Sequence, residues 1–271
     1  MCGRYSAVKD PARLVEEFEA IDATGGQLSA PDYNVAPTKA VAAVVQRHPR
    51  DAEGNPDPDT TERTIRVMRW GLVPSWAKDP GVAAKMINAR SETAAEKPAY
   101  RTSVKKYRCL MPAAGWYEWQ QEGGTKQPFY VTDPDGASLA MAALWATWRR
   151  PGAPEESPLV TCAVLTTDAF GPLAGIHHRM PLLLPREKWA DWLDPDREDV
   201  AELLLPPAPE VIAGLELRPV STAVNNVRNN EPGLMDRVEP GAVQLDAPPQ
   251  RKAPARKKDR QDSGDALFEL P

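Results

Sequence analysis

The chain has 271 residues, of which 42% are hydrophobic and 26% charged, and its formal net charge is −5 at pH 7. These proportions are near globular averages and exclude a wholly disordered chain. No apolar run approaches the roughly 18 residues that cross a bilayer. The start of the chain has no apolar signal core, and three widely spaced cysteines are typical of reduced thiols, so we expect a cytoplasmic protein.

The first predicted element is a helix that begins at Asp10-Pro11, a good N-cap and first-turn pair. Leu14, Val15 and Phe18 then share one helical face. Stretches rich in Val, Ile, Thr and aromatic residues predict strands over residues 41–46, 64–70, 109–113, 129–132, 139–148 and 159–166.

Two more helices are predicted, from Pro185 to Leu193 and from Asp196 to Leu205. Strands outnumber helices and do not alternate with them regularly. The sequence therefore predicts an α+β fold with a curled, mostly antiparallel and barrel-like sheet and flanking helices. We expect one domain over residues 1–246, followed by a disordered basic tail over residues 247–271 that is poor in apolar residues.

Charge is segregated along the chain. Between Lys85 and Arg108 there are seven basic residues and two acidic ones, whereas Asp191 to Glu202 holds six acidic residues and one arginine. Segregation allows a local positive field on an acidic protein. On charge alone, the favoured interpretation is that the basic and the acidic segment each form a solvated face of the protein.

Cys2 is the residue with the most distinctive chemistry. Removal of Met1 would leave an α-amine and a thiol on adjacent carbons, with reference pKa values of about 8 and about 8.5, so both are expected to be partly deprotonated near neutrality. Such a 1,2-aminothiol condenses with an aldehyde to an imine, and the thiolate then closes a five-membered thiazolidine. Taken alone, Cys2 is better explained as a residue that is merely tolerated after methionine.

Several short segments combine aromatic, amide, acidic and basic residues. They are MCGRY at the start, YNVAPT from Tyr33, WGLVPSW from Trp70, NARSET from Asn88, GWYEW from Gly115, HHRMP from His177 and VNNVRN from Val224. Each segment by itself is also consistent with packing. Together, and in this order from Cys2 to about Asn230, they resemble the SRAP family, the SOS-response-associated peptidases that process abasic sites.

The resemblance implies a DNA-damage function. Family members form a covalent thiazolidine between the N-terminal cysteine and the ring-opened aldehyde of an abasic site in single-stranded DNA. The matching catalytic residues here are Cys2, Asn88, Glu118 and His177. Cys2 would supply both nucleophiles, Asn88 would hold the reacting end, and Glu118 and His177 would move protons. Three aromatic neighbours are expected to desolvate Glu118 and raise its pKa. His178 is interpreted as a filler, and no metal or other cofactor is expected.

The resemblance also suggests a DNA-holding group, with arginines on phosphates and aromatic rings on unpaired bases. Its expected members are Arg4, Asn34, Trp70, Trp76, Arg90 and Arg179. Binding of this kind is salt-dependent and largely independent of sequence. Cys109 and Cys162 are interpreted as buried and inert.

The family name carries a peptidase activity, which here is expected to be at most removal of Met1 by the protein itself or by an aminopeptidase. Strand cleavage by β-elimination is a natural lyase side reaction of an imine at an abasic C1′. Two other classes stay open: a non-catalytic single-stranded-DNA-binding protein, and, less favoured, an N-terminal-nucleophile amidohydrolase.

The end of the tail, Asp265-Ala266-Leu267-Phe268, faintly resembles the Leu-Phe end of bacterial sliding-clamp peptides, although Gly264 stands where such peptides carry Gln. A solvated tail with a chance Leu-Phe pair is the favoured interpretation. We expect a monomer that works in the cytoplasm at the nucleoid.

Overall fold

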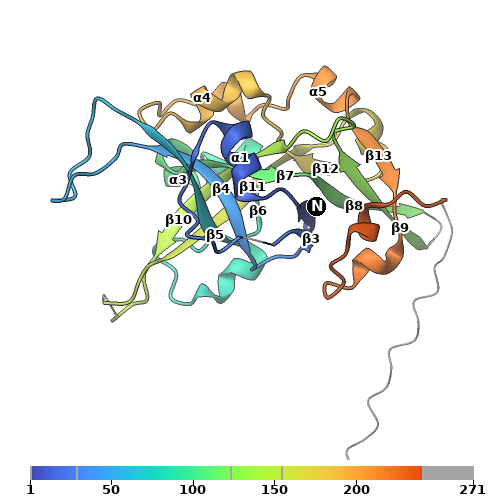
Figure 1. The fold of residues 1–271 in the computed structure, drawn as a ribbon, viewed down its shortest axis with the longest axis horizontal. Helices are drawn as coiled ribbons and strands as arrows, with labels where there is room; N and C mark the ends of the chain where they lie inside the picture. Colours follow the sequence, from blue (N-terminus) through green and yellow to red (C-terminus); the bar gives the residue numbers. More distant parts are fainter. Residues whose placement is uncertain (1, 29, 123, 154, 240–271) are drawn as a thin grey trace, which may run out of the picture.

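Two β-sheets form the centre of the structure, and short helices cover one side of the larger sheet (Figure 1). The computed structural model describes residues 2–28, 30–122, 124–153 and 155–239. The predicted tail and its clamp-like end lie outside these residues, so both remain predictions. Within the described residues, no helix is long and apolar enough to cross a membrane.

The smaller sheet has five strands, which in spatial order are β13 (Glu216–Pro219), β9 (Thr125–Thr132), β8 (Gly115–Glu122), β1 (Tyr5–Ala7) and β3 (Asp32–Val35). The larger sheet has, in spatial order, β12 (Arg179–Pro181), β11 (Leu159–Asp168), β10 (Leu139–Trp148), β7 (Arg108–Ala113), β4 (Ala40–Arg47), β5 (Glu62–Trp70) and β2 (Ile21–Asp22), with β6 (Asn88–Arg90) paired to β11. Most pairings are antiparallel. The predicted strands and the α+β class are therefore confirmed.

The larger sheet curls strongly. In addition to its neighbours in the spatial order, β11 pairs in parallel with β5, through Thr161 with Arg69 and Cys162 with Trp70. The sheet is curled without being a closed barrel. Its concave face packs against β1, and this core contains Cys2, Tyr5 and Trp70, all fully buried.

The helices are short. They are α1 (Pro11–Phe18), α2 (Ser91–Ala94), α3 (Arg101–Lys106), α4 (Trp189–Leu193) and α5 (Pro209–Ala213), with 3₁₀ turns η1 (Pro80–Lys85), η2 (Gly171–Gly175), η3 (Arg186–Lys188), η4 (Ala201–Leu204), η5 (Thr222–Asn225) and η6 (Pro232–Met235). The helix predicted at Asp10-Pro11 is confirmed, because the Asp10 side chain accepts a 2.9 Å hydrogen bond from the Arg13 backbone N–H. Leu14 and Phe18 of α1 pack with Trp189 and Trp192 of α4 on the convex face.

The helix predicted from Asp196 to Leu205 is wrong, since only η4 forms there. Aspartate side chains compete for the backbone in this stretch. Asp194 accepts a hydrogen bond from the Asp196 N–H at 2.9 Å, and Asp199 accepts one from the Ala201 N–H at 3.1 Å. Such local bonds favour turns over helix.

Strand β1 is held between β3 and β8, and one close approach fixes it. Ser6 pairs with Gly115, and the Ser6 hydroxyl lies 2.6 Å from the Tyr130 hydroxyl. A Cβ on Gly115 would stand 2.5 Å from the Tyr130 ring and from the Val131 carbonyl oxygen, so glycine is required there. The backbone that leads to Cys2 is thereby packed tightly on β8.

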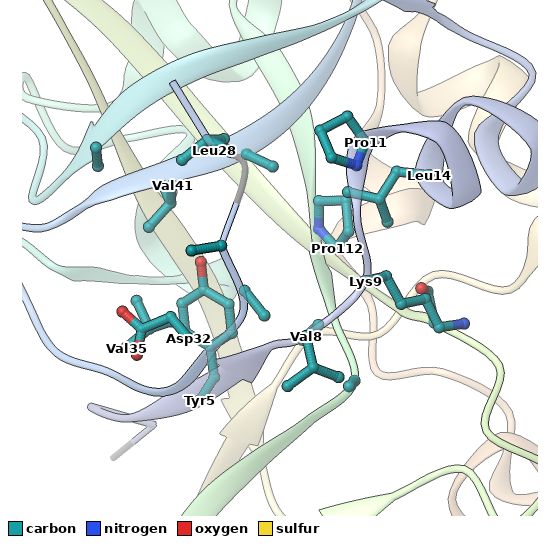
Figure 2. A pocket seen from close by; sticks show the side chains of 17 residues that line it. Tyr5, Val8, Lys9, Pro11, Leu14, Leu28, Asp32, Val35, Val41 and Pro112 are labelled. Atoms are coloured by element: carbon teal, nitrogen blue, oxygen red, sulfur yellow. The ribbon is translucent and has the colours of Figure 1, made fainter. Parts of the chain in front are cut away.

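A small cavity of about 60 Å³ lies beside β1. Figure 2 shows the Tyr5 hydroxyl directed into it among Leu28, Val41 and Pro112. This hydroxyl is buried and receives no hydrogen bond from the described residues. Tyr5 also contacts Trp70 edge to face, with ring centroids 5.4 Å apart.

Replacing Tyr5 with phenylalanine should stabilise the fold. The change removes the cost of a buried hydroxyl, about 1 kcal/mol, and keeps the contact with Trp70. For a domain of this size that corresponds to a rise in Tm of roughly 2–4 °C, measurable by thermal unfolding. A lower Tm for Tyr5→Phe would contradict the prediction and would show that the hydroxyl has a hydrogen-bond partner in solution.

Candidate functional site around Cys2

Cys2 lies three positions before Tyr5, the first residue of β1, and is fully buried. Its carbonyl oxygen accepts a 2.7 Å hydrogen bond from Nδ2 of Asn88, which opens β6. Two residues of β1 pair with β3 and with β8, so the N-terminal segment is fixed on both sides. A residue at the end of a chain is normally mobile; here it is part of the core.

The environment of Cys2 changes its acidity. Burial raises the pKa of the Cys2 thiol well above its usual range, and the nearby charge of Glu118 raises it further. The expectation that the thiol is partly deprotonated near neutrality is therefore wrong for the buried residue. Its sulfur needs a proton acceptor before it can act as a nucleophile.

Glu118 is positioned by the register of β8 on β1. Tyr5 pairs antiparallel with Trp116, which brings Glu118 alongside the residues that precede Tyr5. The Glu118 side chain is only 4% exposed, and this burial raises the pKa of its carboxyl, as its aromatic neighbours predicted. Glu118 is thus a carboxyl group with raised proton affinity whose charge acts on the Cys2 thiol.

Asn88 presents one used and one unused polar atom. Its Nδ2 binds Cys2, whereas its Oδ1 is buried and receives no hydrogen bond from the described part of the chain. Its backbone is held by pairing with Val164 of β11 and by the Tyr100 hydroxyl, which donates to the Asn88 carbonyl at 3.3 Å. The free acceptor can receive a hydrogen bond from a ligand.

His177 lies between η2 and β12 and is half-buried. The Arg179 backbone N–H donates to its Nδ1 at 2.9 Å, and the Arg179 carbonyl oxygen lies 3.2 Å from the same nitrogen; the shorter contact favours the tautomer with the proton on Nε2. Burial lowers the pKa of His177, so the neutral form dominates near pH 7. The exposed His178 stacks on His177 with ring centroids 4.2 Å apart, and its charge lowers the pKa of Glu118.

These elements converge because of the sheet topology. Strands β6 and β12 both pair with the C-terminal half of β11, and the Gln120 side chain of β8 donates to the Gly175 carbonyl in η2 at 3.1 Å. The structure thus carries all four predicted catalytic residues on neighbouring elements. Among the described residues, no group of three or more His, Cys, Asp or Glu side chains is placed to hold a metal ion.

Three residues of the predicted DNA-holding group keep an accessible surface. Arg90 is exposed at the end of β6, and Trp76 is 67% exposed. Arg4 is half-buried; its guanidinium donates to the Asn34 Oδ1 at 2.7 Å and to the Val224 carbonyl at 2.9 Å. It also lies 5.9 Å from the centre of the Trp119 ring.

The other three are buried. Trp70 is fully buried and donates to the Ile87 carbonyl at 2.9 Å. The Asn34 amide donates to three carbonyls of the segment after β13, at 2.9, 3.1 and 3.3 Å. The Arg179 guanidinium is 3% exposed and contacts Glu92 at 2.7 Å and Asp168 at 2.6 Å. In this structure Trp70 and Asn34 offer no surface to DNA, and Arg179 is already paired with two carboxylates.

Sequence patterns did not single out some neighbours of the site. Trp119 is half-buried, donates through Nε1 to the Asn225 Oδ1 at 2.7 Å and lies beside Arg4. Glu92 and Asp168 hold Arg179, which in turn holds His177. Trp119 follows Glu118 directly in the GWYEW segment, which was the available signal for it. Nothing local in the sequence pairs Asp168 with Arg179 across β11 and β12.

Comparison with known proteins places this site in a family. A family model described as SOS response associated peptidase (SRAP) matches residues 1–227. The abasic site processing protein YoqW of Bacillus subtilis is 33% identical over 237 residues, covering 87% of this chain and 99% of its own length. The abasic site processing protein HMCES of Gallus gallus is 34% identical over 293 residues, covering 95% of this chain and 82% of its own.

Solved structures agree on the fold. A crystal structure of a protein from Bacteroides thetaiotaomicron has a TM-score of 0.72 at 22% identity, covering 88% of this chain and all of that one. A protein from Bordetella bronchiseptica has a TM-score of 0.62 at 29% identity, covering 81% of this chain and all of its own. The fold and the site define a domain built around a buried cysteine next to the N-terminus. The chain belongs to the SRAP family.

The ion pairs of Arg179 with Glu92 and Asp168 should stabilise the fold to an extent that depends on pH. Hydrogen bonding to Arg179 lowers the pKa of Glu92 in the folded protein, so this contribution is present above the usual glutamate pKa and is lost as pH falls through the lowered value. Arg179→Gln should cost about 2 kcal/mol at pH 7, since Glu92 is partly solvated and the loss stays below that of a fully buried pair.

Urea unfolding at pH 7 and again below about pH 4 measures this difference. We expect the difference in the free energy of unfolding between the wild type and Arg179→Gln to be smaller at the lower pH. A gap that is the same at both pH values would contradict the ionic origin of the stabilisation.

Proposed function

We propose that the protein captures abasic sites in single-stranded DNA by forming a covalent thiazolidine through Cys2 once Met1 has been removed. One observation carries the proposal: Cys2 is fixed in the core, hydrogen-bonded to Asn88 and close enough to Glu118 for the charge of that carboxyl to act on its thiol. The relatives named abasic site processing proteins support the same assignment.

The chemistry balances without a cofactor. The α-amine of Cys2 attacks the C1′ aldehyde of the ring-opened sugar, and the carbinolamine loses one water to give an imine. The Cys2 sulfur then bonds to C1′ as the imine π electrons move to nitrogen, and the thiol proton ends on that nitrogen. The product is protein plus DNA minus one water. The two nucleophiles share one residue, so closure is intramolecular and fast.

The surrounding residues are suited to the proton transfers. The Glu118 carboxylate takes the proton that burial otherwise keeps on the thiol. The free Oδ1 of Asn88 accepts a hydrogen bond from the sugar or from the reacting amine. His177 is neutral and carries its proton on Nε2, so it can donate to the sugar oxygen during ring opening and recover the proton later.

Among the residues of the DNA-holding group, we propose that the accessible side chains contact DNA and that the buried ones support them. Arg90 and Trp76 are accessible for phosphate contact and base stacking, and Arg4 with Trp119 forms a cationic and aromatic surface close to β8. Arg179 acts as a positioning residue for His177 through its backbone N–H. Trp70 and Asn34 support these groups from within the core.

Two finer activities belong to the same proposal. Met1 must leave before the amine of Cys2 can react, either by the action of this site or through an aminopeptidase. The imine is also the species from which β-elimination would cleave the strand. Thiazolidine closure competes with that lyase reaction and shields the lesion.

A gel-shift experiment under denaturing conditions tests the assignment. The protein is incubated with single-stranded DNA that carries one abasic site, and the covalent product is resolved from free DNA. We expect a product for the wild type, none for Cys2→Ala, and a yield reduced by roughly tenfold or more for Asn88→Ala. Cys109→Ser, a change at a buried cysteine of β7, is the matched control and should retain the product.

A wild-type protein that lacks Met1, binds the DNA and forms no product would overturn the covalent assignment. The non-catalytic single-strand binder would then be the better description. Equal yields for the wild type and Cys2→Ala would instead show that another nucleophile is responsible.

The rate of product formation should depend on the protonation of Glu118. The carboxylate is the active form, so the rate falls as pH drops through the raised pKa of Glu118. Glu118→Gln should lower the rate at pH 7 by a factor of about 100 and flatten this acid limb. A pH series of single-turnover rates measures both effects. A Glu118→Gln variant that keeps the acid limb would assign that limb to another group.

A further inference from the structure

A second surface with nucleic-acid chemistry lies at the other end of the curled sheet. Two adjoining hollows of about 310 and 360 Å³ share Arg47, Trp145 and Thr147. We call them together the arginine–tryptophan groove and define it by Arg47, Arg66, Trp76, Tyr107, Trp145 and Thr147. None of the four proposed catalytic residues lines either hollow, and of the proposed DNA-holding residues only Trp76 does.

The cations of this groove lack counterions. The Arg47 guanidinium lies 5.0 Å from the centre of the Trp145 ring, and within the described residues it makes no hydrogen bond or ion pair. Glu62 is opposite Arg47 in the strand register but forms no ion pair with it. Arg66 is exposed and uses only its Nε, on the Thr64 hydroxyl at 3.1 Å.

The electrostatic surroundings of Arg47 are positive. Burial lowers the pKa of Arg47, and the charges of Arg50 and Arg66 lower it further. Among the described residues that line the two hollows there is no Asp or Glu. An anion placed here would therefore relieve repulsion between arginines and satisfy unused N–H donors.

Aromatic rings of the groove are held rigidly beside these charges. Tyr107 packs against Trp145 with ring centroids 4.8 Å apart, and the Ser103 hydroxyl donates to the Trp145 carbonyl at 2.8 Å. Trp76 is 67% exposed at the rim. Arginines that contact a phosphate backbone, interleaved with rings that stack on unpaired bases, are typical of single-strand binding grooves.

The groove is within reach of the same DNA strand. Val160 lines it and lies four residues before Val164, the β11 residue that pairs with Asn88. At about 3.3 Å per residue, the groove begins roughly 13 Å from the level of the site. A few nucleotides that flank the lesion span that distance.

We propose that the arginine–tryptophan groove binds the single strand that flanks the captured abasic site, through phosphates on Arg47 and Arg66 and a base on Trp76. This inference rests on the proposed function for the identity of the ligand. It adds a second anchoring surface that holds long single strands more tightly than short ones.

The test compares oligonucleotides of about 3 and about 24 nucleotides, each with one central abasic site or none, so that the short strand ends before the groove. Binding of the undamaged strands is followed by fluorescence anisotropy over a series of salt concentrations. The variants are Arg47→Gln/Arg66→Gln in the groove and Arg13→Gln/Lys188→Gln on the exposed surface of α1 and η3, which remove the same charge. The Tm of each variant is measured first.

For the long strand, the slope of log K against log salt is negative, and the groove variant should make it shallower by about 1.4. Each phosphate contact on a single strand contributes about 0.7 to its magnitude. The control variant should leave the slope unchanged. The yield of cross-linking to the short abasic strand should be the same for the wild type and both variants. This yield tests the proposed function, whereas the salt slopes test the groove.

An unchanged slope for the groove variant, or an equal loss for the control variant, would overturn the inference. An equal loss on blunt duplex DNA would overturn its single-strand part. If Arg47→Gln lowers the Tm, Arg66→Gln alone should still reduce the slope by about 0.7, and Arg47→Lys/Arg66→Lys should restore it.

Discussion

The fixed burial of the N-terminal segment is the constraint on which the site depends. Cys2 is in the core because β1 pairs on both sides and because Asn88 donates to the Cys2 carbonyl. The same burial raises the pKa of the thiol, and the nearby Glu118 is the proton acceptor of the proposed mechanism. A free chain end would have a more acidic thiol but no defined position relative to a sugar, and an ordered nucleophile gains more from orientation than it loses in acidity.

The free-energy cost of burying the Arg179 guanidinium is offset by acceptors that lie directly around it. Arg179 is almost fully buried, yet Glu92, Asp168 and the Thr166 carbonyl surround its guanidinium, and its backbone N–H orients His177. By contrast, Arg47, Arg66 and Arg90 make no ion pair within the described residues. Arg179 is thus paired with carboxylates of the protein, whereas the arginines proposed to bind phosphate are not. This distinction separates two sets of arginines that look alike in the sequence.

The sequence predicted the class of fold and most strands, because strand patterning is a local signal. The four residues of the proposed site came from the resemblance of short motifs to the SRAP family, and their roles remain a proposal. It failed where long-range contacts decide. Trp70 and Trp76 belong to one short motif, but only Trp76 is exposed. Asn34 is bound by carbonyls about 190 residues away in the chain. The acidic stretch from Asp196 became turns because its own side chains bind the backbone.

The most direct test of the central claim is the intact mass of the protein after reaction with a single-stranded oligonucleotide that carries one abasic site. Condensation at the α-amine and sulfur of Cys2 predicts a single species equal to the protein without Met1, plus the DNA, minus one water. It should be absent with undamaged DNA and with Cys2→Ala. A product that retains Met1, or one that forms equally with Cys2→Ala, would contradict the account.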